Sequence, residues 1–213
     1  MPDIRLVHPL RSSPFASVVL AALALACCSC ATSVAISGRI AQPAPPSGSP
    51  VQIEDAIVYV EALGPMLDRW TPATRHDTAL RFDHGSLEPR VSAAAAGTRL
   101  RVENRDSVFH RPFSVSPAAA FDARVLGPGE SRTIDLRTGG VVQVFCEHHK
   151  LESASVLVLT HGAWTHPDAG GRFTLPPLPR GGYRVHLWHP QLGERVTPVT
   201  IAHPGPITLE MSF

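Results

Sequence analysis

Between Ala79 and Thr160 the chain repeats short stretches in which apolar and polar residues alternate, separated by turn sequences such as LGPGE and RTGG. In RLRVEN, Leu100 and Val102 fall on one side of an extended chain. In VVQVFC the same alternation turns Cys146 inward at a strand end. The later stretch SASVLVLT is apolar on both faces, which is typical of an interior strand. The pattern predicts a series of short β-strands.

Strand-like stretches also flank this region on both sides. They are AISGRIA and EDAIVYVEA before it, and RFTL, YRVHLW, VTPVTIA and ITLEMSF after it. Loops rich in Pro, Ser and Gly separate them, and the 21 prolines are about twice the usual share. The sequence shows neither a sustained helical period nor an internal repeat. It therefore predicts an all-β fold built from β-sandwiches.

The first 26 residues are typical of an export signal. Arg5 and Arg11 precede the apolar segment FASVVLAALALA, which is too short to span a bilayer. The sequence ALAC resembles a bacterial lipoprotein cleavage box, which predicts a lipid anchor at Cys27; ordinary cleavage after Ala35 is the alternative. In either case we expect the protein in the periplasm or the cell envelope.

Charge says little about a partner beyond one exclusion. The formal net charge is +1, and Lys150 is the only lysine. No basic tract is therefore present to neutralise phosphates or anionic lipids. We expect no binding to nucleic acid.

Three of the four cysteines lie at the signal boundary, and Cys146 alone belongs to the predicted folded body. A disulfide within that body is impossible, and an unpaired thiol in an oxidising compartment is a liability unless a metal occupies it. Cys146 and His149 form a C-x-x-H pair, in which a strand end and the next loop can face one ion. A second imidazole must come from another strand end, and His110 fits.

The stretch Ala79 to Thr160 resembles the cupredoxins, copper proteins of the plastocyanin type. It is more similar to exported cupredoxin-like proteins with an N-x-D-x-x-x-H element and a later C-x-x-H-x-x-M. The resemblance implies a Greek-key β-sandwich with one type 1-like copper ion. It also implies that His110, the Cys146 thiolate and His149 bind that ion.

Two positions depart from this family pattern. Glu152 stands where the family has its axial methionine, and Arg111 follows the first histidine, where asparagine is common. A carboxylate is a harder, anionic ligand that favours Cu(II), so a bound Glu152 would lower the reduction potential. If Glu152 points away, Leu151 would cap a three-coordinate site. Zinc is the second metal that this donor set suits.

The flanking stretches resemble a second family, the carboxypeptidase regulatory-like, transthyretin-like β-sandwiches. The signature G-x-F-x-L-x-x-L-x-x-G-x-Y is carried by Gly171, Phe173, Leu175, Leu178, Gly182 and Tyr183. The resemblance implies a structural or binding module without catalysis. The predicted organisation is a signal at 1–26 and a cupredoxin-like domain at 75–160, inserted into a discontinuous β-sandwich formed by 34–64 and 161–213.

Plainer interpretations stay open for several residues. Cys146 taken alone fits a small buried core residue. His148 is expected at the surface, or as a hydrogen-bond donor behind a ligand. Two histidine and tryptophan groups suggest either an auxiliary metal site or, as we expect, an exposed sheet face: His186, Trp188 and His189, and His161, Trp164 and His166.

The residues together predict an exported copper-binding protein that is not an enzyme. It would transfer single electrons, or handle copper, for an unknown redox protein partner. The alternative is a structural or ligand-binding envelope protein whose copper site has decayed, for which the missing methionine is the best support. A Cys–His hydrolase is the third hypothesis, but the sequence indicates neither a base nor an oxyanion site for it.

Overall fold

A computed structural model of the protein describes residues 33–41, 51–64, 77–160 and 163–213. Within these ranges the regular structure is β-strand, apart from one short 3-10 turn, η1 (Ile53–Asp55). The all-β prediction is confirmed. None of the helices in the described part of the chain is long and apolar enough to cross a membrane. The predicted signal, Cys27, His161 and most of the loop at 64–77 lie outside the described residues.

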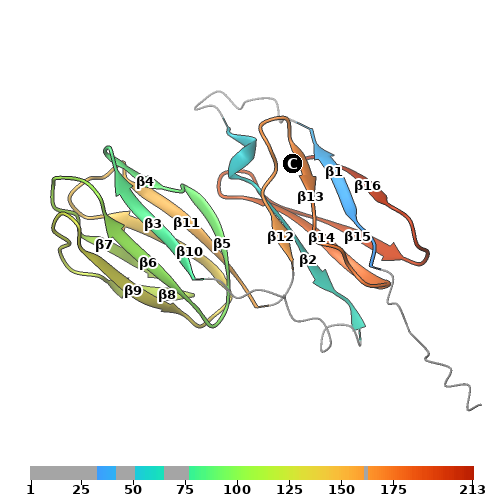
Figure 1. The fold of residues 1–213 in the computed structure, drawn as a ribbon, viewed down its shortest axis with the longest axis horizontal. Helices are drawn as coiled ribbons and strands as arrows, with labels where there is room; N and C mark the ends of the chain where they lie inside the picture. The colour runs from blue at the N-terminus through green and yellow to red at the C-terminus, as the bar shows by residue number, and fades with distance from the viewer. Residues whose placement is uncertain (1–32, 42–50, 65–76, 161–162) are drawn as a thin grey trace, which may run out of the picture. The chain divides into compact units, whose positions relative to one another are not determined.

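Nine strands between residues 78 and 159 form two sheets that enclose one core (Figure 1). One sheet has the order β5-β11-β10-β7-β8, and the other has the order β4-β3-β6-β9. We call this unit the first sandwich. Its strands are β3 (Thr78–Asp83), β4 (Ser86–Glu88), β5 (Val91–Ala95), β6 (Thr98–Asn104), β7 (Pro112–Ser116), β8 (Ala119–Asp122), β9 (Ser131–Leu136), β10 (Gly140–Cys146) and β11 (Ser153–Leu159).

The core of the first sandwich follows the alternation in the sequence. Leu100 and Val102 of β6 are fully buried, as are Val142 and Val144 of β10, and Cys146 continues that inward row at 4% exposure. β11 lies between β5 and β10, in agreement with its two apolar faces. Cys146 is therefore an inward-facing residue at the end of an interior strand.

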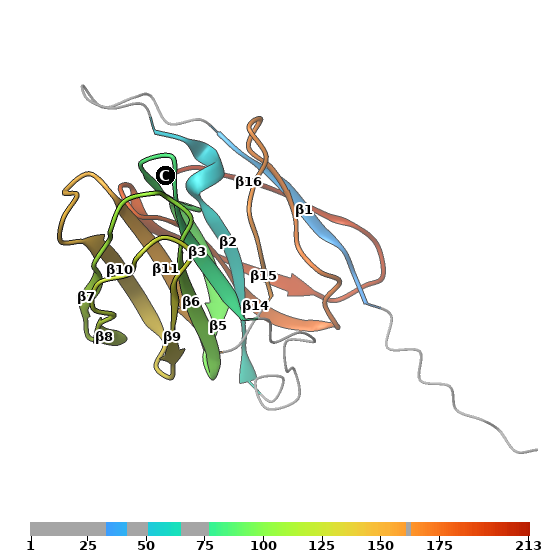
Figure 2. The ribbon, with the colours of Figure 1, turned by 60° about the vertical axis from the view of Figure 1, so that its left-hand side comes forward.

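The remaining strands form a second sandwich, which the chain builds in two separate passes (Figures 1 and 2). One sheet has the order β13-β1-β16, with β1 paired to both neighbours, and the other has the order β12-β2-β14-β15. The strands are β1 (Ile36–Ile40), β2 (Ile57–Ala62), β12 (Trp164–Thr165), β13 (Arg172–Thr174), β14 (Gly181–His189), β15 (Gly193–Ile201) and β16 (Ile207–Met211). Two of them precede the first sandwich in the sequence, and five follow it.

The structure corrects one prediction in the second sandwich. His189 is only 1% exposed, and does not lie on an exposed sheet face. Tyr183, Val185 and Leu187 point inward from β14, and a period of two carries the same side on to His189. His186 and Trp188 fall on the other side, where they are partly buried.

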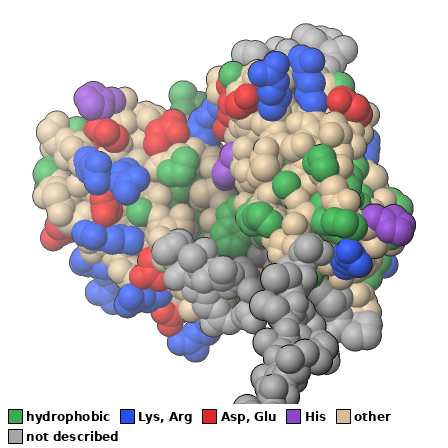
Figure 3. All heavy atoms as spheres, turned by 45° about the vertical axis from the view of Figure 1, so that its right-hand side comes forward, with side chains coloured by type: hydrophobic (Ala, Val, Ile, Leu, Met, Phe, Trp, Pro, Cys, Tyr) green, Lys and Arg blue, Asp and Glu red, His purple; other side chains and the backbone are tan. Residues whose placement is uncertain are grey.

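Basic and acidic side chains are interspersed on the surface. Figure 3 shows Lys and Arg side chains lying among Asp and Glu on the face that it displays. No large field of one sign covers that face, as expected from a formal net charge of +1.

Candidate metal centre

The loop between β10 and β11 carries three of the four predicted ligand residues. Cys146 ends β10, and its backbone N–H donates to the carbonyl of Glu152 at 3.1 Å. The N–H of Glu152 in turn donates to the carbonyl of His149, also at 3.1 Å. These two bonds close the loop tightly, so that side chains three and six positions after the cysteine return toward it.

The fourth residue, His110, comes from the connection between β6 and β7. Its backbone pairs with Leu126 in both directions, which ties this connection to the one between β8 and β9. Asn104, fully buried at the end of β6, donates from its side-chain amide to the carbonyls of Val108 at 2.7 Å and Leu126 at 2.9 Å. It also accepts the N–H of Asp106 at 2.9 Å. One buried amide thus shapes the loop that delivers His110.

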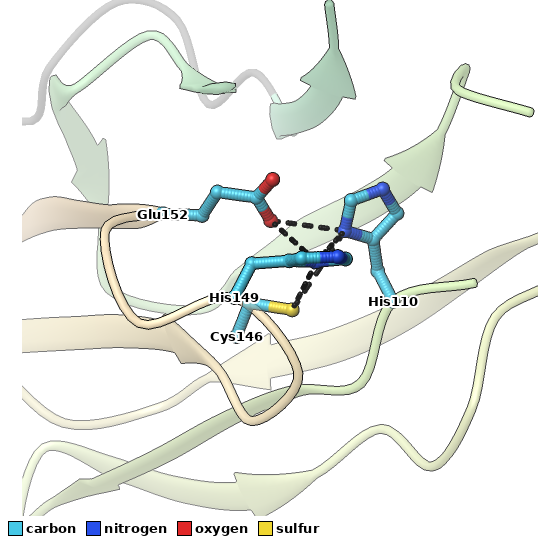
Figure 4. A group of neighbouring side chains, drawn as sticks. All are labelled: His110, Cys146, His149 and Glu152. Atoms are coloured by element: carbon cyan, nitrogen blue, oxygen red, sulfur yellow. Dashed lines mark hydrogen bonds and ion pairs between the residues drawn. The ribbon is translucent and has the colours of Figure 1, made fainter. Parts of the chain in front are cut away.

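The four side chains converge on one point (Figure 4). The Nδ1 atoms of His110 and His149 are 3.2 Å apart, and the Cys146 Sγ lies 3.7 Å and 3.5 Å from them respectively. The Glu152 Oε2 lies 2.9 Å from the His110 Nδ1 and 3.3 Å from the His149 Nδ1. All four ligand-type atoms lie within 4.8 Å of one another.

These separations suit a single transition-metal ion. A tetrahedral ion with bonds of about 2.0–2.3 Å holds its ligand atoms about 3.3–3.6 Å apart. Soft thiolate and imidazole donors fit copper or zinc, and the carboxylate adds a hard, anionic donor. Such an ion would give all four facing donors a common partner. The donor set therefore fits a metal of this class.

Burial separates one member of the set from the other three. Cys146, His110 and Glu152 are 4%, 0% and 6% exposed, whereas the His149 side chain keeps 40% of its surface accessible. The centre is closed to solvent except at His149.

A second carboxylate holds the far side of His110. The Asp106 Oδ2 lies 3.1 Å from the His110 Nε2, and the Asp106 side chain is 13% exposed. If Asp106 accepts the Nε2 proton, the Nδ1 lone pair is directed at the centre, as a metal ligand requires. Phe82 stacks on the ring with centroids 4.0 Å apart, which fixes its plane. Sequence reasoning assigned Asp106 no role, although a carboxylate four residues before the histidine was the available signal.

Arg111, the second departure from the family pattern, ties the outside of the centre together. Its guanidinium pairs with Asp122 of β8 and with Glu147 of the β10–β11 loop, each at 2.6 Å. Its carbonyl also accepts the backbone N–H of Glu147 at 3.0 Å. The contacts of Arg111 are with neighbouring strands and loops.

The structure also decides between the alternatives for the loop residues. Leu151 is 99% exposed and does not cap the centre, because Glu152 takes the inward position. His148 is exposed, in agreement with a surface position.

Comparisons with solved structures find copper proteins. A purple cupredoxin from Nitrosopumilus maritimus is 21% identical over 39% of this chain and 100% of its own, with a TM-score of 0.35. A single-residue mutant of amicyanin, in a Cu(I) structure, is 16% identical over 39% of this chain and 82% of its own, with a TM-score of 0.36. The copper-containing nitrite reductase of Thermus scotoductus SA-01 is 19% identical over 46% of this chain and 27% of its own, with a TM-score of 0.38. No protein-family model and no curated protein matches the chain.

Proposed function

We propose that the protein is an exported, copper-binding, cupredoxin-like protein that transfers single electrons or handles copper, and that it is not itself an enzyme. One observation carries the proposal: His110, Cys146, His149 and Glu152 turn four ligand-type atoms toward one point. Copper bound there would supply a one-electron couple. The chain's own residues would hold it, orient it and exclude water from it.

Glu152 supports a site for a divalent ion rather than a decayed one. A residue that had merely replaced a lost methionine would be expected in solvent, but Glu152 is 6% exposed and faces both imidazoles. A thiolate and a carboxylate together carry two negative charges, which a divalent ion balances. Cu(I) would leave one uncompensated charge in a buried site, and that is costly.

The test is a copper titration of residues 31–213, which retain Cys146 as the only thiol. We expect an intense thiolate-to-copper charge-transfer band and a Cu(II) paramagnetic resonance signal that saturate at one equivalent. Cys146→Ser should abolish the band. Stoichiometric copper without a band that depends on Cys146 would contradict the site, and no bound copper would favour a structural or ligand-binding envelope protein.

Zinc is the second candidate metal, because one thiolate, two imidazoles and a carboxylate are acceptable zinc ligands. Loading the protein with equal amounts of copper and zinc, followed by metal analysis, tests which of the two metals the site prefers. Affinities of mixed N, O and S sites generally rank Cu(II) above Zn(II). If the protein retains zinc in preference to copper, a structural or storage role of the site is favoured over electron transfer.

The proposed location rests on the sequence at 1–26, and the proposed lipid anchor rests on Cys27. The second sandwich is proposed as a non-catalytic, transthyretin-like module. One contact supports this proposal: Gly38 of β1 lies directly against the ring of Phe173 in β13. The two residues come from the two separate stretches that carry the resemblance.

A further inference from the structure

Access to the proposed copper site is restricted to one side. Cys146, His110 and Glu152 are almost fully buried, so an ion can reach them only past the His149 ring. His149 belongs to the loop 147–152, so the residues of that loop are its neighbours along the chain. The chemistry of those neighbours therefore bears on how copper enters and leaves.

Three of the four neighbours are unsuited to a metal ion. Lys150 is a cation, and Leu151 is apolar and 99% exposed. Glu147 is a carboxylate, but Arg111 already holds it at 2.6 Å. His148 remains. Its imidazole is exposed, and within the described part of the chain no hydrogen bond or ion pair occupies it.

The rings of His148, His149 and His110 form a graded series from solvent to core. The centroids of the His148 and His149 rings are 6.4 Å apart, and those of His149 and His110 are 4.8 Å apart. Exposure falls along the series, from the exposed His148 through the 40% accessible His149 side chain to the fully buried His110. Neutral imidazole is a common ligand for copper.

We propose that His148 is a loading ligand for copper. It captures an incoming Cu(II) complex at the surface, displaces one donor of the carrier, and passes the ion to His149, after which the buried donors complete the site. The step is ligand exchange without change of oxidation state. This inference rests on the proposed copper function and adds a route to it.

A loading ligand affects rates and not the final state. Because His148 is no part of the filled site, its loss should slow uptake and release by the same factor and leave the affinity unchanged. The test mixes metal-free protein with Cu(II) bound by glycine and follows growth of the charge-transfer band by stopped flow. Release is followed by adding excess EDTA to the loaded protein.

We expect His148→Ala and His148→Gln each to slow both processes by about tenfold, at the low end of the range over which association rates vary among related variants. The final band, its stoichiometry and the affinity should match those of the unsubstituted protein. His203→Ala is the matched control, since it removes an exposed histidine from the β15–β16 connection of the second sandwich, and its rates should not change.

Two results would overturn the loading role: unchanged rates in both His148 variants, or an altered final spectrum, which would make His148 a resident ligand. Failure of the copper function itself is recognised separately. In that case the unsubstituted protein develops no band with copper glycinate, and the loading role falls with it.

Discussion

At the scale of single residues, Glu152 carries the second negative charge of the proposed copper site, and its effect on the reduction potential can be isolated. Glu152→Met should raise the potential, because it removes the charge that favours Cu(II) over Cu(I). Each tenfold loss of that preference corresponds to about 59 mV for one electron, and we expect a rise of that size or more. A spectroelectrochemical titration measures it.

Glu147→Gln is the control for the Glu152 prediction. It removes the same charge from the same loop, at a side chain that is 53% exposed and turned to Arg111. The reduction potential of Glu147→Gln should rise by less than that of Glu152→Met, because solvent screens an exposed charge. Equal shifts for the two variants would mean that Glu152 acts only as a distant charge and not as a ligand.

Asp106 is the residue behind His110, and we expect its loss to weaken copper binding. Hydrogen-bond partners of metal-bound histidines are worth about 10–100-fold in metal affinity, so Asp106→Ala should cost about that much. Asp106→Asn keeps an acceptor oxygen and should cost less. Competition with a chelator of known affinity measures both. An Asp106→Ala affinity equal to that of Asp83→Ala, an acidic control beside His84, would contradict this role.

His189 gives the free energy of unfolding a pH dependence of its own. Its Nδ1 accepts the N–H of Gln191 at 3.1 Å, and its Nε2 lies 3.2 Å from the Gln52 carbonyl, so the neutral ring is satisfied on both sides. Burial lowers the pKa of His189 below its ordinary value of about 6.5, although the Gln52 carbonyl partly opposes this. The unfolded chain therefore binds this proton more readily than the folded protein does.

Because the pKa is lowered in the folded state, this contribution is intact above about pH 6.5 and is lost as the pH falls from there toward the lowered value. The slope is at most about 1.4 kcal/mol per pH unit for one proton. Urea unfolding between pH 7.5 and 5.5 should show a shallower decline in His189→Gln. A decline as steep as in the exposed-histidine control His203→Gln would assign the pH dependence to other groups.

At the scale of elements, β1 leaves no room for a side chain at Gly38. A Cβ built there would lie 2.6 Å from the Phe173 Cζ of β13 and would also meet the backbone carbonyl of Leu209 in β16. Since β1 pairs with both of these strands, Gly38→Ala has to push the sheet apart. Overpacking of this kind costs about 1–3 kcal/mol, and more where backbone must move. Chemical denaturation measures the loss.

Gly182→Ala in β14 is the matched control for the Gly38 substitution. Its Cβ would make only ordinary contacts with Leu63, at 3.7 Å or more. We expect the free energy of unfolding of Gly182→Ala to change by no more than about 0.5 kcal/mol. If both variants were equally stable, the close approach at Gly38 would not constrain β1.

The elements also show how far sequence reasoning reaches. Alternation is local, so it predicted β6 and β10 and their inward residues correctly. Strand pairing is not local: Ser37 of β1 faces Thr174 of β13, and the alternation near either residue does not indicate this register. The alanines at 93–95 lie in β5, in parallel register with β11, and that pairing depends on a partner far along the chain.

The same distinction applies to the candidate site. Cys146 and His149 could be paired from their spacing alone, since a strand end and the next loop meet locally. The inward turn of Glu152 depends on the backbone bond between Cys146 and Glu152 that closes the loop, and a sequence pattern does not reveal that bond. The burial of His189 is a local property, because the alternation of Tyr183, Val185 and Leu187 in β14 extends to it.

At the scale of the whole molecule, a bound ion should stabilise the folded state by mass action. A ligand that binds only the folded protein contributes about 4 kcal/mol at a free concentration a thousandfold above its dissociation constant. Calorimetry with and without one equivalent of copper should show a higher midpoint in the loaded protein. Cys146→Ser should show no such rise, and an equal rise in that variant would place the stabilising copper elsewhere.

The two passes by which the second sandwich is built have a consequence for the order in which the protein matures. Val60 of β2 pairs with Val185 of β14, and β1 pairs with β13 and β16. The first two strands therefore cannot complete their pairing until nearly the whole chain has been synthesised. At synthesis rates of about 5–20 residues per second, that delay lasts on the order of ten seconds. β11, the last strand of the first sandwich, arrives near the end of this interval, and until then β1 and β2 lack partners. A chain that ended after β11 would hold a complete metal pocket together with two strands that lack partners, and such exposed edges can pair with another chain.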